Sequence, residues 1–411
     1  MTNSNREVSK TGSHIESIFS DRISDVPRSF IREILKVTVD RSIISFAGGL
    51  PNRVLFPVEE LKQATLKVFD TFGSDVLQYS NSEGFIGLRE MIAERYHDKK
   101  NLDISTADIL ITNGSQQGLD LLGKVFVNES DPVVIDEPAY LGAIQAFSIF
   151  KPKFYTVPLT KEGMDIKAFK SVMYSVKPRL IYTVPNFQNP SGISYSRKNR
   201  YEIAEIIRGT STLLVEDDPY GELRYTGQSL PSFKSIIPEN TILLGSFSKT
   251  VVPGFRLGWI VADGKIMDKL ITAKQASDLH TSQFTQYIVY QYMKDNDLDI
   301  HIRRIREAYG AQLKVMAECI DQCFPDGVSR TSPQGGMFIW VVLPANTSSR
   351  ELLELAMKEK VIFVPGDQFY INRNDTNTMR LNFSCSDEDT IRKGIKRLGG
   401  AINQLLNTQR R

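Results

Sequence analysis

Seven short runs rich in Val, Ile and Leu recur between about residues 108 and 262, and longer amphipathic stretches separate them. Strands that are apolar along their whole length are buried on both faces, as in a mainly parallel sheet covered by helices. The alternation of runs and helical stretches therefore predicts an α/β fold, with a mainly parallel seven-stranded sheet sandwiched by helices. The runs are residues 109–112, 133–135, 154–157, 180–184, 213–215, 242–244 and 259–261.

Outside this region the pattern changes. Beyond about residue 290 it predicts a long helix, two strands and a final helix, which together form a smaller α+β domain; before residue 51 it predicts one helix and a strand-and-turn segment. These elements are residues 302–322, 337–342, 379–383 and 388–406, and residues 30–39 and 43–51. The 411 residues fit about two domains. We expect a mobile tail (1–14), an N-terminal segment joining the small domain and the substrate entrance (15–50), a large domain (51–290) and a small one (291–411).

Composition excludes several classes of partner. The chain has 50 Lys and Arg against 48 Asp and Glu, so charge gives no reason to expect nucleic acid or an anionic membrane. Cys319, Cys323 and Cys385 are too few for a disulfide framework and have no second pair to complete a zinc site. No run approaches the roughly 18 apolar residues of a membrane span. We expect a cytoplasmic protein with reduced thiols and no bound metal.

Polar groups at the strand ends are the informative feature, since ligands of open α/β sheets bind beyond the carboxyl ends of the strands. After residues 109–112, the loop NGSQQG opens a helix, which makes a phosphate seat with Ser115 and Gln116 as donors; an ordinary serine N-cap is the alternative. After residues 180–184, an NPSG turn carries Asn189, whose amide can bond a ring hydroxyl or a substrate group.

The next two strand ends carry charge. Asp217 and Asp218 follow a buried strand, where a carboxylate needs a positive partner such as a pyridinium nitrogen; a helix cap or a surface acid pair is the alternative. Lys249 follows the next strand, in Ser-Phe-Ser-Lys, and as a neutral amine it can form a Schiff base with an aldehyde, although lone lysines are usually solvated. Seven residues later, Arg256 can return to a phosphate as a forked donor.

These motifs in this order resemble the fold-type I pyridoxal-phosphate aminotransferases of classes I and II. NPSG, DDPY, SFSK and GFRLGW are similar to that family's signatures. ISFAGGLPN, LQYS, NGSQQGLDLL, DEPAY and YTVPNFQNPSG resemble the subgroup with 2-aminoadipate and kynurenine aminotransferases. The similarity runs from about residue 28 to 400. It implies pyridoxal 5'-phosphate as cofactor. It also implies ping-pong transfer of an amino group from a 2-aminoadipate-like, aromatic or branched-chain amino acid to a 2-oxo acid such as 2-oxoglutarate.

The resemblance also implies roles for single residues. Lys249 would be the Schiff-base lysine and the base that moves the α-proton. Asp217 would pair with the pyridinium, and Asp218 would be its neighbour. Tyr220 and Asn189 would hold the ring hydroxyl oxygen. The remaining cofactor contacts would be Ser115, Gln116, Ser246, Ser248 and Arg256 on the phosphate, Tyr140 stacked on the ring, and Tyr79 reaching the phosphate of the partner subunit, which implies a homodimer with shared active sites.

For the substrate, the resemblance implies that Arg380 pairs with the α-carboxylate, with Asn189 and Gly49 close by. Arg32 matches a position on a mobile N-terminal helix that contacts side chains. The family usually has Pro-Ser before that helix, whereas this chain has Pro27-Arg28-Ser29, which adds a charge near the entrance. The four histidines match no motif.

Two other functions remain open. One is another reaction on the same scaffold, such as that of a β-lyase or a decarboxylase, because a shared fold does not fix the reaction. The other is the effector-binding domain of a transcription regulator. The first 40 or so residues are too short for a winged helix-turn-helix, which disfavours the regulator.

Overall fold

The structure is a computed structural model, and it describes residues 18–24, 26, 40, 42–373 and 376–409. The expected tail (1–14), the expected helix (30–39), and Arg28 and Arg32 lie outside the described residues. The predicted domain boundaries stay predictions.

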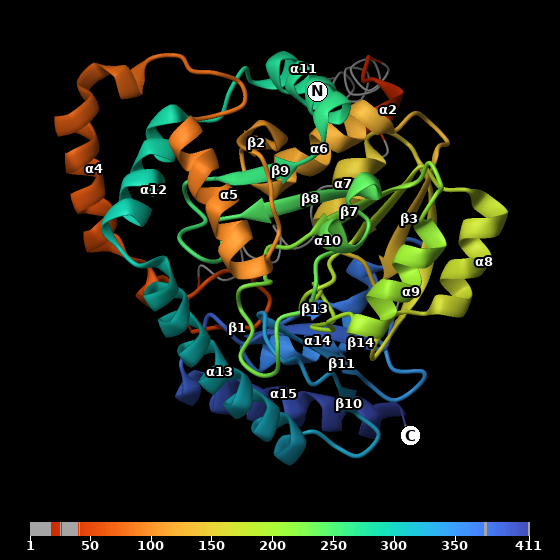
Figure 1. Ribbon diagram of the computed structural model, residues 1–411. Coiled ribbons are helices and arrows are strands. Elements are labelled where there is room, and N and C mark those ends of the chain that lie inside the picture. The colour runs from red at the N-terminus through yellow and green to blue at the C-terminus, as the bar shows by residue number, and fades with distance from the viewer. Residues whose placement is uncertain (1–17, 25, 27–39, 41, 374–375, 410–411) are drawn as a thin grey trace, which may run out of the picture.

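A large sheet organises the first two thirds of the chain (Figure 1). Its spatial order is β2 (Ile109–Thr112), β9 (Gly258–Val261), β8 (Thr241–Ser246), β7 (Leu213–Asp217), β6 (Leu180–Thr183), β3 (Pro132–Glu137), β4 (Lys153–Thr160) and β5 (Gly163–Met164). The neighbours from β8 to β4 are parallel, whereas β9 runs antiparallel to both β2 and β8. All seven predicted strands are present, and the α/β class is confirmed. The short β5, which pairs antiparallel with β4, is an eighth strand that the prediction lacks.

Helices cover both faces of this sheet. Successive side chains of a strand point to opposite faces, and in β3 the side chains of Val133 and Ile135 belong to one buried cluster while Val134 belongs to another. The first face packs against α6 (Ser115–Phe126), α7 (Leu141–Ser148) and α11 (Gly264–Ser277). The second packs against α8 (Ile166–Val176), α9 (Arg197–Ile207) and α10 (Phe233–Ile236), and, near β2 and β9, against α4 (Val58–Phe72), α5 (Ile86–Lys100) and α12 (Gln283–Asp295).

The C-terminal elements form a second, smaller group of helices and strands, drawn in teal to blue in Figure 1. It comprises α13 (Leu298–Cys323), β10 (Ser329–Arg330), β11 (Phe338–Val342), α14 (Ser349–Lys358), β12 (Val361–Ile362), β13 (Val364–Pro365), β14 (Thr378–Asn382) and α15 (Glu388–Gln409). The antiparallel sheet has the order β10-β11-β14-β13. The strand β1 (Ile44–Ser45) pairs with β12, so this short segment belongs to the C-terminal part. A short helix, α2 (Asp21–Ser24), and five 3-10 turns complete the described elements: Arg53–Leu55, Gly73–Leu77, Thr106–Asp108, Pro238–Asn240 and Gly366–Phe369.

The packing of the Trp259 side chain between β8 and β9 depends on the absence of a side chain at Gly245. Gly245 lies opposite Trp259 across the two strands, and a Cβ at position 245 would overlap the indole ring. We therefore expect Gly245→Ala to lower the free energy of unfolding of the apoprotein by about 1–3 kcal/mol, the usual cost of overpacking. Urea unfolding would measure it. Gly254→Ala is the matched control, because a Cβ there meets no atom within 4 Å, and equal losses in both variants would contradict the prediction.

Candidate active site

The candidate site lies at the edge of the sheet where the parallel strands end. Thr112 at the end of β2 and Ser246 at the end of β8 both face Gly258, where antiparallel β9 begins. The turn before β9 therefore returns to the edge where β8 ends. A cavity of about 810 Å³ opens there. Twelve of the predicted site residues line it: Gly49, Ser115, Gln116, Tyr140, Asn189, Asp217, Tyr220, Ser246, Ser248, Lys249, Arg256 and Arg380.

Lys249 projects from the turn after β8. Its Nζ donates a hydrogen bond to the carbonyl oxygen of Gly49 at 2.9 Å. Burial lowers the pKa of this amine from 10.5 to about 8, Cys385 opposes the shift, and the positive charges of Arg380 and Arg256 add to it. An amine with such a pKa is neutral often enough near neutral pH to act as a nucleophile or a base.

Asp217 ends β7 and is 2% exposed. Its Oδ2 accepts a hydrogen bond from the Tyr182 hydroxyl at 2.7 Å, while its buried Oδ1 has no partner among the described residues. Burial raises the pKa of Asp217 to about 7, although the Tyr182 bond opposes that shift. A buried carboxylate oxygen without a donor fits a protonated ring nitrogen. Asp218 instead accepts from Asn186 and faces Lys100, away from the cavity lining.

Arg380, on β14, reaches the cavity from the C-terminal sheet. Its guanidinium donates to Asn189 Oδ1 at 2.8 Å and to the carbonyl oxygen of Ala47 at 2.6 Å, and it lies over the rings of Phe338 and Phe369. Arg380 is 2% exposed, burial lowers its pKa to about 10, and no carboxylate of the described chain pairs with it. A buried cation without a counter-ion is costly, so this site favours an anionic ligand. Asn189 also bonds the Tyr220 hydroxyl.

A phosphate seat forms where β2 leads into α6. Gly114 has φ +74°, a left-handed conformation that favours glycine, and a Cβ on it would lie 2.7 Å from the guanidinium of Arg256. A Cβ on Gly258 would lie 2.7 Å from the Ser115 nitrogen, so two glycines allow β9 and Arg256 to approach the loop closely. The free N–H groups at the start of a 12-residue helix, with an arginine beside them, suit a phosphate.

The turn after β3 forms another wall of the cavity. The ring of Tyr140 lies against Gly142, where a Cβ would overlap it, and the side-chain amide of Gln116 donates to the carbonyl oxygen of Gly142 at 2.9 Å. This bond links the start of α6 to Gly142, against which the Tyr140 ring lies. Burial raises the pKa of Tyr140 to about 12, so the hydroxyl stays protonated.

Two predicted site residues are not in the cavity lining. Tyr79 lies on the surface with 79% of its area exposed, and Arg32 is outside the described residues. The sequence analysis also missed Tyr182 and Cys385, which interact with Asp217 and Lys249 respectively. Tyr182 lies inside a predicted strand, and its hydroxyl among apolar residues was the available signal. Cys385 gave none, because only tertiary packing brings it to the lysine.

Comparison with known proteins identifies the family. The Aminotransferase class I and II family matches residues 47–398. Aromatic-amino-acid aminotransferase 1 of Thermococcus litoralis is 40% identical over 395 residues, which is 95% of each chain. The 2-aminoadipate transaminase of Thermus thermophilus is 40% identical over 93% of this chain and 95% of its own. The crystal structure of Pyrococcus horikoshii kynurenine aminotransferase in complex with PMP has a TM-score of 0.91 and 40% identity, and covers 96% of this chain and 99% of that one.

The fold and the cavity are those of a fold-type I pyridoxal-phosphate enzyme. The chain belongs to the class I and II aminotransferases, and it is a pyridoxal-phosphate-dependent aminotransferase. In the part of the chain that the structure describes, no helix is both long and apolar enough to cross a bilayer.

The raised pKa of Asp217 predicts how the stability of the apoprotein changes with pH. Folded, the carboxyl keeps its proton up to about pH 7, whereas the unfolded chain loses it near pH 3.8. The folded state binds this proton more tightly than the unfolded state. The stabilisation that follows is fully present below pH 3.8 and is lost as the pH rises from there through about 7. Asp217→Asn removes this dependence. The free energy of unfolding of the variant relative to wild type should therefore rise from pH 4 to 7.5, by about 4 kcal/mol at most.

Urea unfolding of the two apoproteins across this range would measure the difference. Asp136, which burial also shifts to a pKa of about 7, is present in both proteins and cancels. A constant difference between Asp217→Asn and wild type would contradict the prediction.

Proposed function

We propose that the enzyme transfers the amino group of a 2-aminoadipate-like, aromatic or branched-chain amino acid to a 2-oxo acid such as 2-oxoglutarate, by a ping-pong mechanism. The observation that carries this proposal is the buried guanidinium of Arg380, which lines the same cavity as Lys249 and lacks a carboxylate partner among the described residues. Amino donor and oxo acceptor share one group, the α-carboxylate. The names of the relatives, which include aromatic amino acid, 2-aminoadipate and kynurenine aminotransferases, support the choice of donors.

Arg380 fixes the orientation of both substrates. A guanidinium can bind a carboxylate through two parallel N–H groups, which sets the direction of the Cα as well as its place. Phe338 and Phe369 lie on the guanidinium plane, and Asn189 and Ala47 accept one hydrogen bond each from its two terminal nitrogens. Lys249 Nζ bonds the carbonyl oxygen of Gly49 and Arg380 bonds that of Ala47, so both side chains contact the same short segment.

Lys249 moves the proton. When bound, pyridoxal phosphate supplies an aldehyde to take the amino group and a ring to accept the electron pair of the broken Cα–H bond. Lys249 would hold the cofactor at that aldehyde, and its Nζ would serve as the base that takes and returns the α-proton. The lowered pKa, about 8, keeps the nitrogen available for this work near neutral pH.

The other lining residues would hold the cofactor. The unpartnered Oδ1 of Asp217 would keep a proton on the ring nitrogen, and Tyr220 and Asn189, which bond each other, would bond the ring hydroxyl oxygen. Tyr140 would lie against the ring. The phosphate would be held by Ser115, Gln116, Ser246, Ser248 and Arg256, which all line the cavity.

We also propose a homodimer with shared active sites. Tyr79 is accompanied at the surface by other exposed apolar side chains of neighbouring segments, among them Phe69, Leu77 and Leu279. Apolar groups gathered on one surface favour a protein partner, and Tyr79 would then reach the cofactor phosphate of the partner subunit. Arg32 as a contact for distal side chains stays a prediction, as does the cytoplasmic location.

A screen of amino donors tests the reaction itself. With 2-oxoglutarate as acceptor, each active donor should yield its own 2-oxo acid and an equal amount of glutamate. Arg380→Ala should raise KM for every donor and for 2-oxoglutarate, each by about 10- to 100-fold, because all lose the same charge-assisted pair. Release of ammonia or carbon dioxide without glutamate would contradict aminotransfer and would point to a β-lyase or a decarboxylase.

Lys249→Ala tests the covalent attachment. The variant should lose turnover, and borohydride treatment should no longer add the mass of the cofactor to the protein, because no amine at the end of β8 can hold the aldehyde. Mass spectrometry of the reduced protein measures this. Lys198→Ala, on the exposed face of α9, is the control and should label like wild type. A cofactor adduct at the active site of Lys249→Ala would refute the assignment.

Mixing two inactive variants tests the shared site. If Tyr79 serves the partner subunit, a mixed dimer of Lys249→Ala and Tyr79→Ala has one doubly defective site and one intact site. Random mixing should then restore about one quarter of the wild-type activity, since half of the dimers are mixed. The assay uses a cofactor concentration at which neither variant alone is active. No recovery on mixing, with dimers present by light scattering, would place Tyr79 in its own subunit's site instead.

A further inference from the structure

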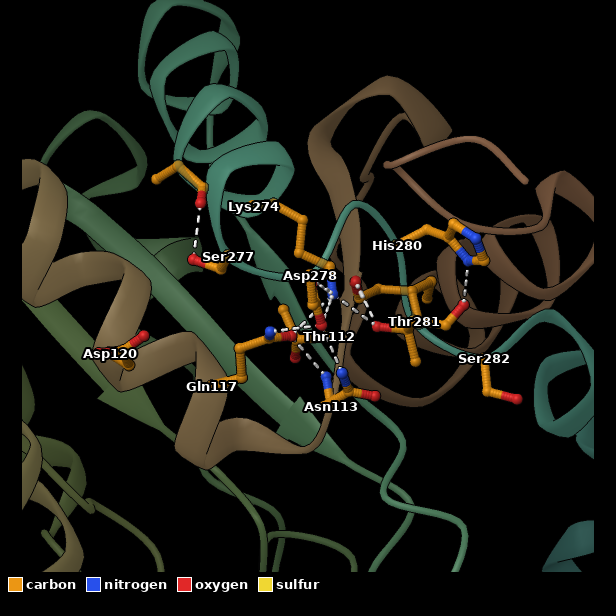
Figure 2. Close-up of polar contacts among 12 residues, drawn as sticks. Thr112, Asn113, Gln117, Asp120, Lys274, Ser277, Asp278, His280, Thr281 and Ser282 are labelled. Carbon is orange, nitrogen blue, oxygen red and sulfur yellow. Dashed lines mark hydrogen bonds and ion pairs between the residues drawn. The ribbon is translucent and has the colours of Figure 1, made fainter. Parts of the chain in front are cut away.

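An ion pair at the C-terminal end of α11 has no part in the chemistry proposed above. The Nζ of Lys274 is completely buried and donates to both carboxylate oxygens of Asp278 at 2.8 and 2.9 Å. It also donates to Thr281 Oγ1 at 2.9 Å and to Gln117 Oε1 at 2.8 Å (Figure 2). Burying an ammonium costs more than burying an apolar group of the same size, so the pair is a poor device for stability alone.

The hydrogen bonds of this pair converge on one loop residue. Asn113 donates its side-chain amide to Asp278 Oδ2 at 2.5 Å and its backbone N–H to Gln117 Oε1 at 2.8 Å. Gln117 in turn donates to Asp278 Oδ2 at 2.7 Å, and Thr281 donates to the carbonyl oxygen of Ile111 at 3.2 Å. Figure 2 shows these side chains between the start of α6 and the end of α11.

The network and β9 hold the same loop from different directions. From one side, Arg256 and Gly258 lie close to Gly114 and to the Ser115 nitrogen. From the other side, Asp278 accepts a hydrogen bond directly from Asn113. Lys274 is linked to Asn113 through Gln117. Neither Lys274 nor Asp278 lines the cavity. The backbone N–H groups that face the cavity therefore depend on side chains that never touch a ligand.

We propose that Lys274 and Asp278 are positioning residues that hold the start of α6 in the geometry that accepts the cofactor phosphate. The proposal rests on the proposed function, in which Ser115 and its neighbours bind that phosphate. Supporting residues of this kind decide whether a site is held tightly enough to bind.

The segment that contains Asp278 also supports Tyr79. His280 Nε2 accepts a hydrogen bond from the backbone N–H of Ser80 at 3.3 Å, and the His280 ring lies edge-on to Tyr79 with 5.9 Å between ring centroids. Because the Ser80 N–H is a donor, Nε2 is unprotonated, and Nδ1 donates to the carbonyl oxygen of Thr281 at 2.9 Å. One short segment thus supports the phosphate loop of its own subunit and the tyrosine proposed to serve the partner.

The test compares two ligands that differ only in the phosphate. Full-length apoprotein is titrated with pyridoxal phosphate and with pyridoxal, and the dissociation constants are measured. Lys274→Met should weaken pyridoxal phosphate by about tenfold or more, the effect of losing one charge-assisted hydrogen bond. Pyridoxal, which has a hydroxymethyl group in place of the phosphate ester, should bind as it does to wild type. Should Lys274→Met fail to fold, Gln117→Met removes the link between Lys274 and Asn113 from a partly exposed position and should give the same selective loss.

Lys124→Met is the matched control. Lys124 also joins α6 to α11, by donating to Ser277 Oγ, and it pairs with Asp120 within α6, but on an exposed face away from the loop, so both ligands should bind as in wild type. If the network variants weaken both ligands equally, or neither, Lys274 and Asp278 are only structural and the proposal is wrong. If wild type itself does not prefer pyridoxal phosphate to pyridoxal, the phosphate seat of the proposed function fails, and this inference fails with it.

Discussion

Desolvation of three charged side chains around one cavity is the constraint on which the site depends. Burial raises the pKa of Asp217 and lowers the pKa values of Lys249 and Arg380, and in each case the first cause is the loss of water. The described chain supplies no counter-charge to Asp217 Oδ1 or to Arg380. In the proposed function ligands would supply it, with a protonated ring nitrogen beside the Asp217 carboxylate and a substrate carboxylate beside the Arg380 guanidinium. The protein holds these charges in an unfavourable state that binding relieves.

The sheet makes this arrangement possible because it brings separate segments to one edge. Parallel strands β6, β7 and β8 end beside each other and deliver Asn189, Asp217 and Lys249 in spatial order. Antiparallel β9 reverses the direction, so the turn before it returns Arg256 to the same edge. The C-terminal sheet contributes only Arg380, across the cavity. Most of the proposed cofactor contacts and Arg380, the proposed partner of the substrate α-carboxylate, thus come from different sheets, and the cavity lies between them.

Much of this could be predicted from sequence because strand ends are local features. The buried runs are continuous and the polar groups follow them directly, so Lys249, Asp217 and Ser115 could be found from their position after a strand. Contacts between distant segments carry no such signal. Lys274 and Asp278 look like an ordinary i,i+4 surface pair on a helix, yet packing brings them to the loop after β2. His280 matched no motif, yet packing brings it to residues 79 and 80. The two-residue β5 is too short to give a pattern.

The position of β2 has a consequence for how the protein is made. This strand comes first in the large sheet but lies at its edge. Among the described residues it pairs with one strand, β9, which is the last of that sheet in sequence, and Ile109 lies opposite Val261. A chain emerging from the ribosome can form the parallel strands in between before β2 has anything to join. The loop after β2 contacts Arg256, Gly258 and the end of α11. The proposed phosphate seat can therefore be complete only after about two thirds of the chain has been translated.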